Sequence, residues 1–141
     1  MNRRFVSYLF LLFFVGGSLV ACQKEEIDVE ESTLLAGSWQ WVSSTGGITG
    51  QVQTPASTKT TKIIQFTPSN QFISYQNGVK DQETTYSLQK GKSIYSANGQ
   101  TNLIQLANTG SRSSYRLENN QLYLYDECYD CYTHLYVRVV K

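Results

Sequence analysis

The sequence predicts an all-β fold: a small up-and-down antiparallel barrel of eight or nine strands with a short N-terminal helical turn. Short runs of alternating apolar and polar residues follow one another from residue 39 onward, separated by turn-forming residues. No 3.6-residue apolar period appears after the helical turn. Each run therefore has one apolar face, and so many consecutive strands must close on themselves or fold over. An up-and-down barrel does this and removes the sheet edges.

The chain opens with a segment typical of an export signal. Arg3 and Arg4 precede an apolar run over 5–15, which is shorter than the length that a transmembrane helix needs. The following Leu19-Val20-Ala21-Cys22 resembles the bacterial lipobox, which implies cleavage before the cysteine, a diacylglycerol on its sulfur and an acyl chain such as palmitate on the new amine. We expect 1–21 to be a lipoprotein signal peptide and Cys22 the lipidated residue that anchors the protein in the membrane.

Residues 22–32 are polar and acidic, and we expect a flexible tether here. Gln23-Lys24-Glu25-Glu26 within it resembles the acidic signal that carries lipoproteins to the cell surface in one Gram-negative phylum. The expected location is therefore the outer membrane, facing outward. Without 1–21 the chain has 10 basic and 11 acidic side chains, which gives no electrostatic case for nucleic acid as a partner.

The domain over 33–141 has room for one modest core, and we expect a monomer. A helical turn is expected over 30–36, with Gly37 ending it. Between the strands lie Asn-Gly pairs and other turn signals that favour antiparallel hairpins. The strands are predicted at 39–44, 62–67, 71–76, 84–89, 92–95, 101–107, 113–117, 122–125 and 134–140.

Each predicted strand offers alternate apolar residues for one face. The expected inward pairs are Trp39 and Trp41, Ile64 and Phe66, Tyr86 and Leu88, Ile104 and Leu106, Tyr115 and Leu117, Leu122 and Leu124, and Val137 and Val139. One long connection, 45–61, is rich in Gly, Ser and Thr and is expected to be either a functional lid or a flexible tip.

These residues resemble the lipocalin-like domains of bacterial surface lipoproteins. Gly37-Ser38-Trp39 matches the Gly-x-Trp start of the first strand, and Arg138 on the last strand matches the arginine that packs over that tryptophan. The resemblance covers 35–140 and implies structural roles for Gly37, Trp39 and Arg138. Strand alternation conflicts with it: if Leu135, Val137 and Val139 face inward, Arg138 faces outward and needs a bulge to reach Trp39.

Cys128 and Cys131 are the two thiols left for other chemistry in an oxidising compartment. Their two-residue spacing favours a disulfide that fixes a turn, with free thiols as the alternative. His134 continues the spacing, but a structural zinc site needs four ligands, so no metal and no cofactor is expected.

We expect no enzyme, because His134 is the single histidine and no Gly-x-Ser-x-Gly motif exists. The leading hypothesis is a binding module for a small apolar or amphiphilic ligand in the barrel mouth, lined by Trp41, Phe66, Tyr86 and Tyr115. Two alternatives remain: a filled barrel whose outer tyrosines and loops contact a glycan or protein partner, and, less favoured, a hydrolase using paired carboxylates.

Overall fold

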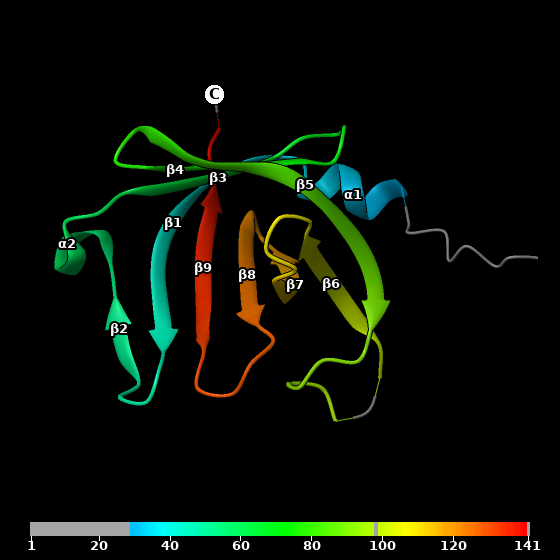
Figure 1. Cartoon of the computed structure of the whole chain (residues 1–141). Helices are drawn as coiled ribbons and strands as arrows, with labels where there is room; N and C mark the ends of the chain where they lie inside the picture. Colours follow the sequence, from blue (N-terminus) through cyan, green and yellow to red (C-terminus); the bar gives the residue numbers. More distant parts are fainter. Residues whose placement is uncertain (1–28, 98, 141) are drawn as a thin grey trace, which may run out of the picture.

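A computed structural model describes residues 29–97 and 99–140, so the predicted signal peptide, Cys22 and most of the tether lie outside the described residues. The predicted fold class is confirmed: eight antiparallel strands close into a barrel, with one extra strand and two short helices (Figure 1). The helices are α1 (Val29–Leu35) and α2 (Pro55–Thr58). The strands are β1 (Gly37–Gly46), β2 (Gln51–Gln53), β3 (Lys62–Phe66), β4 (Gln71–Gln76), β5 (Val79–Gly91), β6 (Thr101–Leu106), β7 (Arg112–Glu118), β8 (Gln121–Asp126) and β9 (Tyr132–Arg138).

Closure of the barrel depends on β1, which pairs with three strands. Its first four residues pair with β3, and its last three pair with the extra strand β2. Along its other edge β1 pairs with β9, the last strand of the chain, from Trp39 opposite Arg138 to Gly46 opposite Tyr132. The two ends of the domain are therefore joined side by side, which removes the free sheet edges that an open nine-stranded sheet would have.

The strand β5 is the longest and serves two neighbours in turn. Its first half, up to Thr85, pairs with β4, and its second half, from Tyr86, pairs with β6. Figure 1 shows β5 curving from one side of the barrel to the other. The sequence predicted only 84–89 as strand here, because the polar residues before Thr84 carry no alternating pattern.

The pairing of β9 with β1 shows which residues of β9 point inward. The register shifts between Trp41 and Ser43, and Trp39 and Trp41 lie opposite Arg138 and Tyr136. Tyr136 is buried and Val139 is exposed. The expected inward pair Val137 and Val139 is therefore wrong, because β9 turns its aromatic and charged residues inward. Arg138 reaches Trp39 by direct pairing, and the bulge instead brings Ser44 to the same face as His134.

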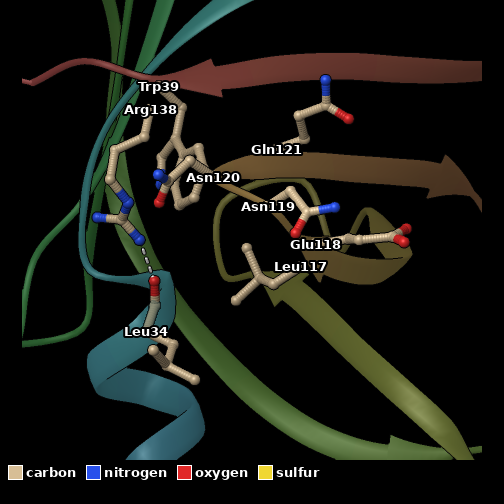
Figure 2. Close-up of a pocket in the computed structure, with 8 residues that line it drawn as sticks. All are labelled: Leu34, Trp39, Leu117, Glu118, Asn119, Asn120, Gln121 and Arg138. Atoms are coloured by element: carbon tan, nitrogen blue, oxygen red, sulfur yellow. Dashed lines mark hydrogen bonds between the residues drawn. The ribbon is translucent and has the colours of Figure 1, made fainter.

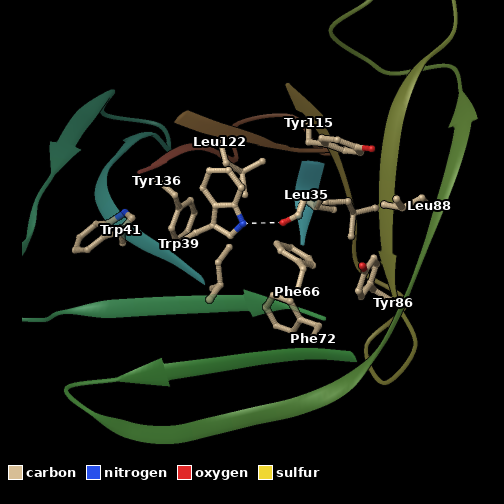
Figure 3. Close-up of a cluster of buried hydrophobic side chains, with 12 residues drawn as sticks. Leu35, Trp39, Trp41, Phe66, Phe72, Tyr86, Leu88, Tyr115, Leu122 and Tyr136 are labelled. Atoms are coloured by element: carbon tan, nitrogen blue, oxygen red, sulfur yellow. Dashed lines mark hydrogen bonds between the residues drawn. The ribbon is translucent and has the colours of Figure 1, made fainter. Parts of the chain in front are cut away.

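The core takes side chains from all eight barrel strands and from α1. Its largest fully buried side chains include Trp39, Trp41, Phe66 and Leu35, and every other expected inward pair contributes at least one buried residue. Figure 3 shows Leu35 of α1 inserted among these rings, with its carbonyl oxygen accepting a hydrogen bond from Trp39 Nε1 at 2.9 Å. Phe66 packs against Phe72 and edge-on against Tyr86, with ring centroids 5.3 and 5.0 Å apart.

The helix α1 closes one end of the barrel and is fixed there by Arg138. The guanidinium lies 4.2 Å from the centroid of the Trp39 ring. It also donates hydrogen bonds to the carbonyl oxygens of Ala36, at 2.8 Å, and of Leu34. These carbonyls end a helix and have no helical donors of their own, so a cation that bonds them stabilises the cap. Gly37 has φ +137°, and a Cβ there would lie 2.6 Å from the Arg138 guanidinium.

Two connections differ from the prediction. The 45–61 segment contains β2 and α2 and is an ordered extension beside β1, in which Thr54 and Ser57 form a capping box. Residues 92–95 are not a strand. There the chain turns back, and Ser93 and Ile94 bond to the Glu127 carboxylate with bonds of 2.6 and 2.9 Å. No helix in the described part of the chain is long and apolar enough to cross a membrane.

Candidate ligand-binding cavity and its rim

An apolar cavity of about 80 Å³ lies inside the barrel, away from the end that α1 closes. Five strands, β3, β4, β6, β8 and β9, supply its apolar walls, and β7 with the turn before it adds a polar edge. A single water needs roughly 10–15 Å³ of such volume, and pockets for drug-sized ligands have about 300–1,000 Å³. The cavity therefore has room for a small group and not for a whole large ligand. It is lined by Ile64, Phe66, Phe72, Ile104, Leu106, Ser111, Ser113, Leu124 and Tyr136.

The four residues predicted to line a ligand site lie in one connected core. Phe66 lines the cavity, whereas Trp41, Tyr86 and Tyr115 do not. Trp41 donates its Nε1 proton to Ser44 Oγ at 2.9 Å, and Tyr86 donates its hydroxyl proton to the carbonyl of Thr67 at 3.2 Å. No residue of the 45–61 segment lines the cavity either. The space lies deeper, between β3, β4, β6, β8 and β9.

Tyr136 lines the cavity, although the sequence alternation placed it on the outer face of the last strand. Its side chain is buried, yet its hydroxyl has no hydrogen-bond partner among the described residues. No fully buried side-chain nitrogen or oxygen in the described ranges lacks a partner, so the Tyr136 oxygen borders accessible space. The signal that could have found it was the resemblance itself: Arg138 beside Trp39 places residue 136 inward by alternation.

A chain of hydrogen bonds borders the cavity at the end opposite α1. His134 contacts Ser44 Oγ through Nδ1 at 2.6 Å and the Asp126 carboxylate through Nε2 at 3.2 Å. Ser113, which lines the cavity, donates to the other Asp126 oxygen at 3.2 Å. Strands β1, β7, β8 and β9 each contribute one member. This network satisfies the buried polar groups that face the barrel interior at that end.

Ser44, His134 and Asp126 have the connectivity of a serine triad, but Ser44 is poorly placed as a nucleophile. Only 2% of its surface is exposed. Its oxygen also already accepts the Trp41 Nε1 proton. A substrate carbonyl needs open access to the attacking oxygen. The geometry instead suits a fixed polar brace between β1 and β9.

The rim carboxylates are held in their ionised form. Burial of Asp126 opposes ionisation, but the hydrogen bond and charge of His134 and the hydrogen bond of Ser113 outweigh it and lower the pKa of Asp126. Burial also opposes ionisation of Glu127, and hydrogen bonds, first from Ser93, again lower the pKa below the usual value. Both groups therefore favour the folded state while they are charged.

Acid should destabilise the fold through these two groups. A lowered folded pKa gives stability that is present above the unfolded values, 3.8 for Asp126 and 4.5 for Glu127, and is lost as the pH falls through the folded values. Asp126→Asn should cost about 1 kcal/mol at pH 7, allowing for solvent screening, and much less near pH 3. Urea unfolding at each pH measures this. Exposed Asp81→Asn is the control, and an equal loss for Asp126→Asn at both pH values would contradict it.

Cys128 and Cys131 form a disulfide in the turn between β8 and β9. Asp130 adopts φ +59° in this turn. The turn is held from two sides: Gly47 N donates to the Cys131 carbonyl at 3.2 Å, and the Tyr95 hydroxyl donates to the Cys128 carbonyl at 3.4 Å. It follows directly after Asp126 and so helps to position the rim.

Other tyrosines lie on the outer face of the barrel rather than in its core. Tyr95 and Tyr125 lie with ring centroids 5.9 Å apart, and Tyr129 is 86% exposed. Arg116 covers the ring of Tyr123 at 4.6 Å. These rings come from β8, from the connection after β5 and from the β8–β9 turn, and none of them lines the cavity.

Figure 2 shows a further hollow, of about 190 Å³, at the end that α1 closes. It lies between Leu34, the Trp39 edge, Arg138 and the turn at Asn119 and Asn120. Arg138 is already engaged there by the helix end and the indole ring. The hollow is therefore a surface depression over the cap and is separated from the interior cavity by the core.

Among residues 29–97 and 99–140, no three His, Cys, Asp or Glu side chains are grouped so that they could hold a metal ion. Comparison with known proteins adds no assignment: no family model and no curated protein matches this chain.

Proposed function

We propose that this protein is a lipid-anchored, extracytoplasmic binding module whose barrel holds the apolar end of a small molecule. The observation that carries the proposal is the apolar cavity of about 80 Å³ with the hydroxyl of the buried Tyr136 on its wall. Empty apolar cavities cost stability, because their lining atoms lose contacts, and a ligand that fills one recovers them. The proposed module is non-enzymatic and resembles the lipocalin-like domains of surface lipoproteins.

The size of the cavity restricts how a ligand binds. An amphiphile would insert only a branched or cyclic end, and its remainder would lie toward Ser111 at the edge of the cavity. Apolar groups gain about 25 cal/mol for each Å² removed from water. A small buried group alone therefore supports micromolar to millimolar affinity, and additional contacts outside the cavity would be needed for tighter binding.

Native mass spectrometry of the full chain, released from the membrane of the cells that make it, tests this function. We expect a small molecule to accompany the protein in addition to its acyl chains and to be displaced by excess 2,3-dimethylbutane. A chain that carries only its acyl chains and does not take up 2,3-dimethylbutane would contradict the proposed cavity function.

The membrane anchor has its own test. Cys22→Ser should abolish incorporation of radiolabelled palmitate, because the sulfur that receives diacylglycerol is gone, and should release the protein from the membrane fraction. Cys131→Ser is the matched control: it removes a cysteine of the β8–β9 disulfide and should leave labelling unchanged. Equal labelling of the Cys22→Ser variant and the parent would exclude lipidation at Cys22.

The exposed tyrosines favour a second candidate function, in which the outer surface contacts a glycan or a protein partner. Tyr95 and Tyr129 are 52% and 86% exposed and lie near the disulfide turn. Aromatic rings of this kind commonly anchor interfaces. Replacing Tyr129 by Ala would weaken such contacts without affecting the cavity, so binding of 2,3-dimethylbutane should be unchanged in this variant.

A further inference from the structure

The Tyr136 hydroxyl is the hydrogen-bond donor on the inner wall of the cavity that no described residue accepts from. The Ser113 hydroxyl also lines the cavity, but it donates to Asp126. The third hydroxyl, that of Ser111, belongs to an exposed residue at the edge of the cavity. Because the Tyr136 oxygen borders the cavity space, a ligand oxygen placed against it would accept its hydrogen bond in a poorly solvated site. A pure hydrocarbon in the same place would cover the hydroxyl without giving it a partner.

The electrostatic surroundings of this hydroxyl are acidic. Asp126 borders the cavity through its hydrogen bond with Ser113. Burial, followed by the charges of Asp126 and Asp81, raises the pKa of Tyr136 above its ordinary value. Asp126 is itself held in the ionised form by His134 and Ser113. The Lys62 ammonium lies over the Trp41 ring, 4.9 Å from its centroid, and does not line the cavity.

We infer that the cavity selects a small neutral molecule whose carbonyl, ester or alcohol oxygen accepts a hydrogen bond from Tyr136, and that it disfavours carboxylates. The apolar wall formed by Phe66, Phe72 and Ile104 takes the hydrocarbon part of such a molecule. A ligand carboxylate would bring a third negative charge beside Asp126 and Asp81 in a poorly solvated space, which is unfavourable. The inference rests on the proposed function, since it names the ligand class for the same cavity.

Three probes with the same six-atom skeleton test this selectivity: 2,3-dimethylbutane, 3-methyl-2-butanone and isobutyrate. Each is titrated into the full chain in lipid nanodiscs at pH 7, and methyl NMR shifts of Ile104, Leu106 and Leu124 report binding. The methyls of Ile48, which is 93% exposed, are the internal control for non-specific effects. Because the skeleton is constant, differences in affinity arise from the oxygen atoms and their charge.

In the parent protein we expect isobutyrate to bind at least about tenfold more weakly than the ketone. In Tyr136→Phe, which removes the donor with little change in volume, the ketone should lose about tenfold in affinity while 2,3-dimethylbutane binds as well or better. Tyr86→Phe is the matched control, because that hydroxyl is bonded to Thr67 and should not affect the ketone. In Asp126→Asn, isobutyrate should gain relative to the ketone.

The outcomes separate the two proposals. Binding of the hydrocarbon together with unchanged ketone affinity in Tyr136→Phe would overturn the inference and leave the cavity function in place. Isobutyrate binding as tightly as the ketone would overturn the exclusion of carboxylates. Failure of all three probes to shift the cavity methyls would overturn both. If Tyr136→Phe does not fold, the test is the affinity of Asp126→Asn for isobutyrate relative to the ketone. A relative gain supports the inference, and an unchanged ratio overturns it.

Discussion

Replacing Trp39 by Ala should destabilise the barrel by about 3–5 kcal/mol, the range for truncating a buried tryptophan. The side chain is 1% exposed, donates to the Leu35 carbonyl and stacks beneath the Arg138 guanidinium. Its loss leaves a cavity and frees the helix end at the same time. Urea unfolding followed by far-ultraviolet circular dichroism measures the change.

Two further variants sharpen this test of Trp39. Trp39→Phe keeps a ring in the core but loses the Nε1 hydrogen bond and part of the contact with Arg138, so its loss should be intermediate. Ile48→Ala, at a position that is 93% exposed, should change stability by less than about 0.5 kcal/mol. A loss below about 1 kcal/mol for Trp39→Ala would show that the cap is not coupled to the core.

Replacing Phe72 by Ala should also cost about 3–5 kcal/mol, because the ring is 8% exposed, packs on Phe66 and forms one wall of the cavity. The variant enlarges the existing space, which gives it a second property. A saturating apolar ligand stabilises a folded protein by about 2.7 kcal/mol at one hundred times its Kd. We therefore expect 2,3-dimethylbutane to raise the unfolding free energy of Phe72→Ala more than that of the parent.

The matched control for Phe72→Ala is Val79→Ala, a truncation at a position that is 70% exposed and away from the cavity. It should unfold like the parent with and without the hydrocarbon. Phe72 would not form a wall of a ligand-accessible space if Phe72→Ala had the same free energy of unfolding as the parent. The same conclusion would follow if the hydrocarbon stabilised the parent, Phe72→Ala and Val79→Ala equally.

The alternation of apolar residues was enough to predict the fold class and most of the core. Pairs such as Ile64 and Phe66 are buried as expected, since an antiparallel strand with one solvated face must alternate. The pattern failed on β9, where Leu135, Val137 and Val139 are the apolar set but Tyr136 faces inward. The prediction followed the hydrophobic residues of this strand. The expected contact of Trp39 with Arg138 would have placed Tyr136 inward correctly.

The site was only partly predictable. Phe66 was predicted to line the ligand site and does line the cavity. The contact of Ser44 with His134 depends on a bulge in β1, and no residue type in Trp41-Val42-Ser43 indicates a bulge. The fold-back at Ser93 was equally hidden, because it depends on a carboxylate 34 positions away. Contacts between segments far apart in the sequence form only when the barrel closes, so local sequence patterns do not predict them.

Xenon under pressure tests the central claim most directly, because a single apolar atom needs neither a headgroup nor an entry path for a large ligand. Methyl NMR of the full chain in nanodiscs should show saturable shifts at Ile104, Leu106 and Leu124, with none at Ile48. Shifts that increase linearly and equally at all four residues would mean that the barrel interior is filled and that no apolar site exists within it.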